Sequence, residues 1–294
     1  ESSAASDVYK RQNVNSDGTI NSKVTCTKGN DVSSELTLKE KVLGTNDSNV
    51  VTSGDGLYSE TTNSGTTYYF KGAVENNYVK FADKVFRIVR INEDGTIRLI
   101  TQDSVASQKF NSTSTTYNEM YYTNSEIKTA VDNWFTTNIT GDNASKVVSG
   151  NYFCEAARVA YDGTNYELNT GSTKLTAKES YTPTFECTTD GNGKGVVTSK
   201  VGLVTYDETI YAGGWYSVSG LSYPYYLNSG SAYWTMSPAG FYTSNYASAW
   251  RVFSDGNSNY YFVFNSYGVR PVLILSADTL VSGSGTNSDP YVVK

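Results

Sequence analysis

The chain has 294 residues, of which 38% are hydrophobic and only 18% are charged, and its net charge is −6. This length fits one large domain, or one domain with a smaller appendage. The negative charge and the lack of any Lys/Arg run argue against a nucleic-acid-binding protein, which needs clustered cations to neutralise phosphates. The composition is neutral, polar and rich in Tyr, with 25 residues of that type. Such a composition is typical of secreted and cell-surface proteins, so we expect an extracellular location.

The first twelve residues, ESSAASDVYKRQ, resemble a translated sequencing adapter of the kind found at the ends of assembled metagenomic fragments. We expect residues 1–12 to be a sequencing artefact, and the natural start to be missing together with any export signal or anchor. The sequence holds no apolar run of the ~18 residues that a membrane helix needs. Membrane anchoring is therefore expected only through the missing segment.

The N-terminal part reads as a small extension. A strand pair is predicted over 13–34, because the turn signal at 15–18 precedes a weakly alternating stretch. A short helix is predicted over 34–43. Residues 45–66 are rich in Gly, Ser, Thr and Asn, which predicts a loop or linker. We therefore separate an N-terminal extension and linker over 13–66 from a main domain over 67–294.

Regular structure is predicted more firmly from residue 67 onward. Strands are expected over 68–70 and 78–81. Two β-branched runs, over 85–91 and 96–101, flank an Asp-Gly turn, which is the pattern of a β-hairpin.

The best-defined helix is predicted over 125–139, where Asn124 or Ser125 can serve as the N-cap. Its apolar residues recur at i, i+3, i+4, i+7 and i+8, the spacing of one helix face. They are Ile127, Ala130, Val131, Trp134 and Phe135.

Residues 140–200 are polar and Gly-rich, and they contain two of the three cysteines. Cys154 and Cys187 bracket this loop-rich stretch and could pair, which would restrict the loop and would suit an exported protein. Cys26 would then remain free. No two cysteines have the CxxC spacing of zinc or redox sites.

Short elements complete the chain. Thr205 and Glu208 form a capping box that predicts a short helix, which Gly213 or Gly214 can end. Strands are then expected around Trp234 and over 249–253, 260–264 and 269–275. An Asp-Gly turn is expected at 255–256. Few helices among many short strands predict an α+β fold, with two main helices and long loops.

The sequence contains no His, which removes the commonest general base and metal ligand. Asp207 and Glu208 are adjacent on a short helix, so their side chains diverge, and Glu208 is better explained as a cap. The glycines of 191–195 lack the strand-to-helix context of a phosphate-binding loop. We therefore expect a protein that is not an enzyme and has no catalytic residues, no cofactor and no metal site. Calcium held by scattered Asp and backbone oxygens stays open.

The most informative segment, 241–266, holds nine aromatic residues among Ser and Asn, and it lacks Lys, Glu, Gln and Met. Antibody paratopes use the same residue types, because Tyr and Trp give rigid contact area while Ser, Gly and Asn adapt their hydrogen bonds. Alternation along the strands places Trp250 and Val252 inward, with Phe262 and Phe264 as further inward candidates. In the alternative interpretation, these aromatics only fill a core. If the segment is instead a binding surface, we expect the ligand to contact its solvent-facing residues. These are a subset of Tyr242, Asn245, Tyr246, Asn257, Asn259, Tyr261 and Asn265.

Two motifs flank this segment, YWTMSP at 233–238 and GVRPV at 268–272. Together they resemble the C-terminal half of bacterial C-type-lectin-like domains, and in particular the variable proteins that diversity-generating retroelements modify in gut bacteria and phages. The stretches 68–100 and 201–214 also look like pieces of surface proteins from gut Bacilli, many of which carry a prepilin-type N-terminal helix. The resemblance covers about residues 20–294 and is strongest over 200–275.

The resemblance implies a C-type-lectin-like domain in which Trp234, Trp250 and 268–271 are scaffold. Arg270 would pair with a backbone carbonyl or a carboxylate. Retroelement diversification mutates adenines, often in AAY codons, which cannot become Lys, Glu, Gln, Met or Trp codons; the single Trp250 would then be a fixed residue. The chain lacks the Glu-Pro-Asn, Gln-Pro-Asp and Trp-Asn-Asp triplets of calcium-dependent lectins. It also has no Cys after Cys187, so the formylglycine-forming activity of enzymes with this fold is not implied.

The expected function is that of an adhesin or receptor-like protein at the cell surface or on a pilus. Its partner would be a protein or glycan ligand on another cell or host surface. The alternative is a structural, pilin-like subunit that uses the same aromatic face for assembly.

Overall fold

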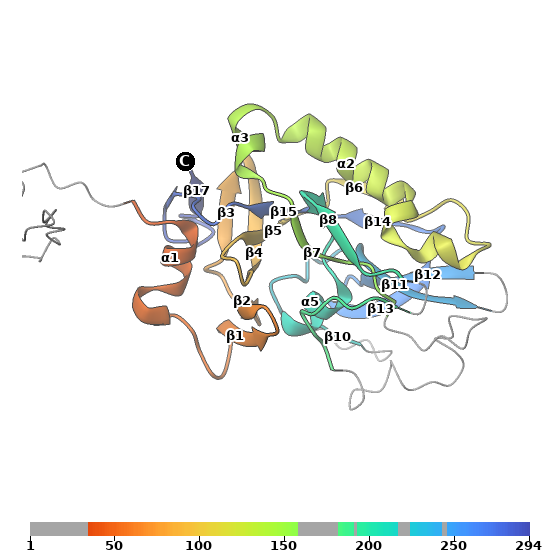
Figure 1. Cartoon of the computed structure of the whole chain (residues 1–294), viewed down its shortest axis with the longest axis horizontal. Helices are drawn as coiled ribbons and strands as arrows, with labels where there is room; N and C mark the ends of the chain where they lie inside the picture. Colours follow the sequence, from red (N-terminus) through yellow and green to blue (C-terminus); the bar gives the residue numbers. More distant parts are fainter. Residues whose placement is uncertain (1–34, 158–181, 191–192, 217–223, 243–245) are drawn as a thin grey trace, which may run out of the picture. The chain divides into compact units, whose positions relative to one another are not determined.

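A computed structural model describes residues 35–157, 182–190, 193–216, 224–242 and 246–294 (Figure 1). Residues Glu35–Lys294 form one compact unit. The strand pair predicted over 13–34 lies outside the described residues. Among the helices of the described ranges, none is long and apolar enough to cross a bilayer.

The first helix, α1 (Leu38–Leu43), begins at a capping box. The Thr37 hydroxyl accepts a hydrogen bond from the backbone N–H of Glu40 (3.2 Å), and the Glu40 carboxylate accepts one from the backbone N–H of Thr37 (2.8 Å). This exchange satisfies two backbone donors at the helix start. It also turns Leu38, Val42 and Leu43 toward the core, where all three are buried.

The prediction of a loop or linker over 45–66 is wrong for the second half of that range, and no domain boundary falls there. After a 3-10 turn, η1 (Thr45–Asp47), strands β1 (Gly56–Thr62) and β2 (Gly65–Lys71) pair antiparallel, and β2 continues the pairing onto β4 (Lys84–Ile91). Most of β1 is exposed or half-buried, so its polar residues carry little alternation that could announce a strand.

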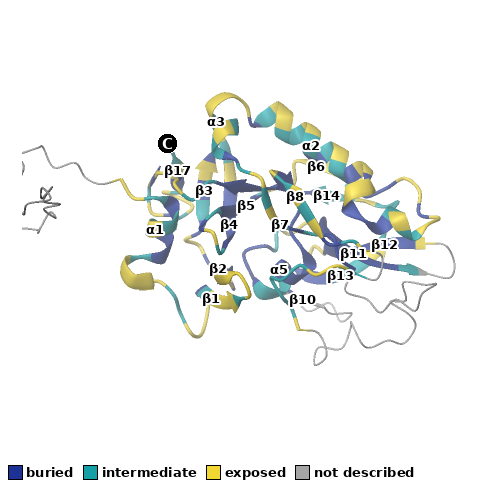
Figure 2. Cartoon of the chain, in the orientation of Figure 1, coloured by how far each residue is buried: buried dark blue, intermediate teal, exposed yellow. Residues whose placement is uncertain are grey.

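A nine-stranded sheet forms one half of the fold, in the order β16-β17-β3-β4-β5-β15-β9, with β2 and β1 added on β4. The predicted hairpin is confirmed: β4 and β5 pair antiparallel, and Gly95 in the turn has φ +83°. The central strands are almost completely buried (Figure 2). Its other strands are β3 (Tyr78–Phe81), β5 (Ile97–Thr101), β9 (Val201–Gly202), β15 (Val272–Leu275), β16 (Val281–Ser282) and β17 (Tyr291–Val293).

A six-stranded sheet has the order β10-β13-β12-β11-β14-β6 and carries the aromatic segment. Its strands are β6 (Ala106–Lys109), β10 (Trp215–Tyr216), β11 (Tyr233–Tyr242), β12 (Tyr246–Val252), β13 (Asn257–Phe262) and β14 (Ser266–Val269). The predicted Asp-Gly turn joins β12 to β13, and Gly256 there has φ +88°. A separate pair is formed by β7 (Gly150–Cys154) and β8 (Val196–Ser199).

The helices are few, and the protein is α+β as predicted. The longest, α2 (Glu126–Asn138), is confirmed with Ser125 as its N-cap, and it buries Ile127 and Val131. Among the described residues every other α-helix has six residues, so the expectation of two main helices is wrong. These are α1, α3 (Gly141–Lys146) and α5 (Tyr206–Tyr211); two further 3-10 turns are η2 (Tyr117–Met120) and η3 (Tyr122–Asn124).

Candidate binding surface

The hairpin of β12 and β13 has a buried side built on Trp250. Its ring is 3% exposed and stacks on Tyr206 of α5, with 4.0 Å between centroids and 12° between planes. The Tyr260 ring meets Trp250 edge-on at 5.6 Å. Val252, two residues along the strand, is completely buried. The inward placement of Trp250 and Val252 is thus confirmed, whereas Phe262 and Phe264 are only half-buried.

The same hairpin carries the aromatic residues that are exposed among those the structure describes. Tyr246, Phe253 and Tyr261 have exposed fractions of 40%, 37% and 41%, and no other aromatic side chain that the structure describes is as open. Together with half-buried rings on or beside the same hairpin they form a set that we call the aromatic cluster, in which ring contacts join every member except Phe253, which contacts the Arg251 guanidinium. Its members are Tyr246, Phe253, Tyr261, Phe262, Phe264 and Tyr267.

The rings of the aromatic cluster support one another. Tyr246 lies 5.0 Å from Phe262 and 5.7 Å from Phe264, while Phe262 and Phe264 stack at 5.6 Å. Tyr261 lies 6.0 Å from Tyr267, and its centroid is 5.7 Å from that of Phe262, the next residue of β13, whose side chain points to the opposite face of the strand. The cluster therefore has a part around Tyr246 and a part around Tyr261 on the two faces of β13. Such offset and edge-to-face contacts hold exposed rings in place at little entropic cost on binding.

The structure sorts the predicted contact residues. Tyr246 and Tyr261 are exposed, and Asn259 and Asn265 are half-buried at the same hairpin and the following turn. The backbone of Tyr242 ends β11, but its side chain lies outside the described part, as does all of Asn245.

The prediction that Asn257 faces solvent is wrong, because this residue is only 2% exposed. Asn257 pairs in parallel with Trp215 of β10, a strand far away in the sequence, and its backbone carbonyl accepts from Phe253 at 2.7 Å. Alternation within one hairpin carries no information about a third strand that pairs beside it, so the sequence had no signal for this environment.

Arg251 is a site residue that the sequence reasoning did not single out. It is 5% exposed, and its guanidinium carbon lies 4.1 Å from the ring centroid of Tyr267, 4.4 Å from that of Tyr261 and 4.9 Å from that of Phe253. Its Nε donates to Asn259 Oδ1 at 2.7 Å. Burial lowers the pKa of Arg251 and raises that of Tyr267. Arg251 lies opposite Asn259 in the register of β12 against β13. Extending the predicted hairpin from its Asp-Gly turn to this register could have identified Arg251 as a site residue.

The flanking motifs act as scaffold. Trp234 is fully buried, its Nε1 donates to the carbonyl of Gln108 at 3.1 Å, and its ring meets Phe110 and Tyr267 edge-on. Arg270 is 1% exposed and donates to two backbone carbonyls, from Nε to Thr101 (2.9 Å) and from Nη1 to Leu227 (2.9 Å). The predicted carbonyl partners of Arg270 are therefore confirmed.

The capping box of α5 is also confirmed, and it has a second role. Glu208 accepts from the backbone N–H of Thr205 at 2.9 Å, and it forms a buried ion pair with Arg98, whose Nε lies 2.7 Å from Glu208 Oε1. The side chains of Arg98 and Glu208 are 0% and 3% exposed. Both oxygens of this carboxylate are thus occupied in holding α5 against the nine-stranded sheet.

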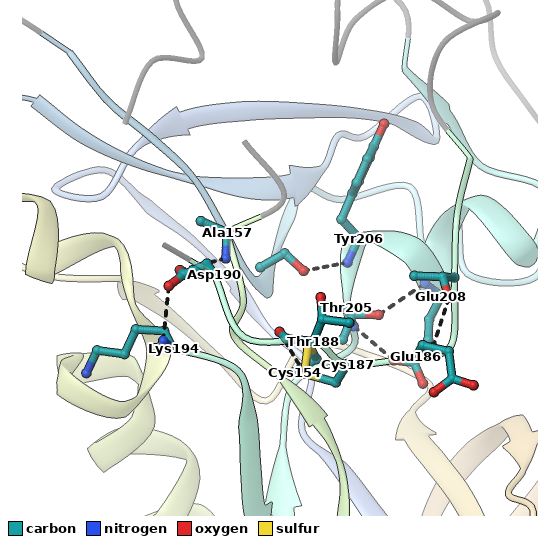
Figure 3. Close-up of a disulfide and its surroundings, with 12 residues drawn as sticks. Cys154, Ala157, Glu186, Cys187, Thr188, Asp190, Lys194, Thr205, Tyr206 and Glu208 are labelled. Carbon is teal, nitrogen blue, oxygen red and sulfur yellow. Dashed lines mark hydrogen bonds between the residues drawn. A yellow bond between two sulfur atoms is a disulfide. The ribbon is translucent and has the colours of Figure 1, made fainter. Parts of the chain in front are cut away.

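A disulfide joins Cys154, at the end of β7, to Cys187, as predicted. Figure 3 shows it beside the start of α5. The segment around Cys187 is also held by Phe185, which stacks on Tyr211 at 3.9 Å and contacts Tyr69 at 5.4 Å. Cys26 lies outside the described residues.

Within the described ranges, no three Cys, Asp or Glu side chains lie close enough together to hold a metal ion. The arrangement offers instead a rigid, largely neutral surface of rings, amides and one guanidinium. Its chemistry is that of contact: stacking, hydrogen bonding and attraction of charge. Comparisons of the chain with models of protein families, with curated proteins and with solved structures find no match.

Proposed function

We propose that this chain is an extracellular, cell-surface binding protein, and that it binds a macromolecular ligand on another cell through the aromatic cluster. The observation that carries the proposal is the placement of Tyr246, Phe253 and Tyr261, the described aromatic side chains that are exposed, on one hairpin. Exposed rings that lie in contact with one another are the usual anchors of recognition surfaces.

The support beneath the cluster fits this role. Trp250 and Val252 anchor β12 in the interior, and β12 pairs with β13 over five consecutive positions. A surface carried on paired strands loses little conformational entropy when a ligand binds. The rings therefore offer contact area that is already ordered.

We further propose a C-type-lectin-like fold of the retroelement-diversified type. Its support is that the two resembling motifs are neighbours in space: Tyr233 of the first pairs in parallel with Gly268 of the second. Both motifs lie on the β12 side of the hairpin, with β11 beside β12 and β14 beside β11. Variation at the exposed positions of the hairpin would leave the buried Trp234 and Trp250 unchanged. In the neighbouring DNA we expect a reverse transcriptase gene and a near-copy of the region encoding 235–270. A locus without either would contradict the diversification.

We also propose that the protein is not an enzyme. The buried carboxylate that most resembles a catalytic group, Glu208, is occupied by the Thr205 backbone and by Arg98. The remaining features of the surface favour binding, since rings and amides contact a partner without transferring protons to it.

The test is binding of the labelled protein to a panel of bacterial and epithelial cells, measured by flow cytometry. Tyr246→Ala and Tyr261→Ala should each weaken binding about 30-fold, equivalent to ~2 kcal/mol, as expected for exposed anchor residues. The matched control is Val85→Ala, because Val85 is 43% exposed on the other sheet. All three variants should melt close to the parent.

If both Tyr variants bind like the parent, the aromatic cluster is not the site. Sedimentation of the same proteins then tests the structural alternative. Concentration-dependent polymers that disappear in Tyr246→Ala and Tyr261→Ala would identify the cluster as a subunit contact of a pilus-like assembly.

A further inference from the structure

We infer that the partner of the aromatic cluster is a protein that presents an acidic side chain, and that its carboxylate pairs with Arg251. This inference rests on the proposed function and names the chemistry of its ligand. The starting observation is a guanidinium that is nearly buried, yet lies under a cluster of exposed rings.

The first step concerns charge. Among the described residues, no carboxylate lies within ion-pair distance of Arg251. Arg90 and Arg98 each have one, at 3.4 Å and 2.7 Å, whereas the buried Arg87 and Arg270 have none and donate to backbone carbonyls instead. The partners of Arg251 that the structure describes are neutral: the Asn259 amide oxygen and three rings. A desolvated cation without a counter-ion is costly, and an incoming carboxylate would offset that cost.

The second step concerns the surroundings. Over residues 232–277 the sequence contains two basic residues, Arg251 and Arg270, and one acidic residue, Asp255. Arg270 is 1% exposed and committed to carbonyls, and Asp255 Oδ1 accepts from the Asn257 backbone in the turn. Within this segment Arg251 is therefore the basic side chain that is not committed to backbone carbonyls, in a chain whose net charge is −6; the exposed Lys109 of β6 lies opposite Ser266 in the same sheet. Rings around it lower the local dielectric constant, which strengthens its attraction for an anion.

The third step concerns the class of partner. Trp, Tyr and Arg are enriched among the residues that dominate protein–protein binding, and such residues cluster in desolvated pockets whose surrounding contacts exclude water. Tyr261 and Phe253 are exposed beside Arg251, so an acidic side chain could reach the guanidinium edge while neighbouring apolar groups contact the rings. This combination favours an acidic and apolar protein surface.

A displayed library of random twelve-residue peptides tests the inference without knowledge of the natural partner. Peptides selected on the parent protein should be enriched in Asp or Glu next to aromatic or aliphatic residues. The same selection on Arg251→Met should lose the acidic enrichment. A selected acidic peptide should bind Arg251→Met at least tenfold more weakly than the parent, and Arg251→Lys, which keeps the charge but not the planar group, should fall between them.

The peptide itself supplies the control for folding. Replacing its acidic residue by the corresponding amide should weaken binding to the parent by the same factor and leave binding to Arg251→Met unchanged. Raising the salt concentration should weaken only the acidic peptide on the parent.

The outcomes separate the two proposals. Peptides that require Tyr246 and Tyr261 but show no acidic enrichment would overturn the role of Arg251 and leave the binding surface in place. Peptides that are indifferent to both Tyr residues would count against the surface itself. A library without binders would overturn the protein-partner inference, and the cell-binding assay would then judge the surface alone.

Discussion

Replacement of Trp250 by Ala tests whether the hairpin has the inside and outside described above. Trp250 is 3% exposed, and its ring is covered on one face by Tyr206 and at its edge by Tyr260. Removal of the indole loses the transfer free energy of a buried aromatic side chain and leaves a cavity between β12 and α5. For Trp→Ala in a packed interior, the expected loss of unfolding free energy is about 3–5 kcal/mol.

The assay is urea denaturation followed by fluorescence, with thermal melts in parallel. At roughly 2–4 °C per kcal/mol for a domain of this size, the melting temperature should fall by about 6–20 °C. The matched control is Phe253→Ala in the same hairpin. Phe253 is 37% exposed, so its removal should cost no more than about 1 kcal/mol.

The reasoning would be refuted by the reverse pattern. If Trp250→Ala melts like the parent while Phe253→Ala or Tyr261→Ala unfolds the protein, the exposed and buried sides have been exchanged. The aromatic cluster would then be part of the core, and a binding role for it would lose its basis.

Two further predictions concern what holds the scaffold together. Glu208→Gln should cost about 3–5 kcal/mol of unfolding free energy, because it leaves the buried Arg98 charge without its counter-ion. The double variant Arg98→Met, Glu208→Leu should lose less unfolding free energy than Glu208→Gln alone. Equal losses of the two variants in urea denaturation would show that the ion pair is not the cause. Replacing Cys154 and Cys187 by Ser opens a crosslink with a sequence separation of 33 residues and should cost roughly 3–4 kcal/mol. Reduction of the parent should reproduce that loss, and an unchanged urea midpoint would contradict a stabilising disulfide.

Local patterns in the sequence were sufficient for several elements. The spacing of Ile127 and Val131, with Ser125 before them, predicted α2, and the Asp-Gly turn predicted the hairpin of β4 and β5. Thr205 and Glu208 predicted α5 through their capping box. Each of these signals acts between residues a few positions apart, so the chain does not have to be folded for them to be read.

The hairpin of β1 and β2 shows where such patterns fail. Its strands are rich in Gly, Ser and Thr and mostly exposed or half-buried, so the apolar alternation that marks a half-buried strand is weak. Pairing of β2 with β4 stabilises this hairpin from outside its own sequence. The boundary predicted over 45–66 followed from reading a polar stretch as unstructured.

In the candidate site, the sequence by itself determined which residue types gather near the C-terminus and that Trp250 points inward. Only the tertiary structure decided that Asn257 is buried where β13 pairs with β10, that Tyr246 and Tyr261 are both exposed, and that Arg251 lies among the rings. The physical reason is that exposure and charge compensation depend on every element packed around a residue. Alternation along one strand reports two faces, but it does not report what lies against each of them.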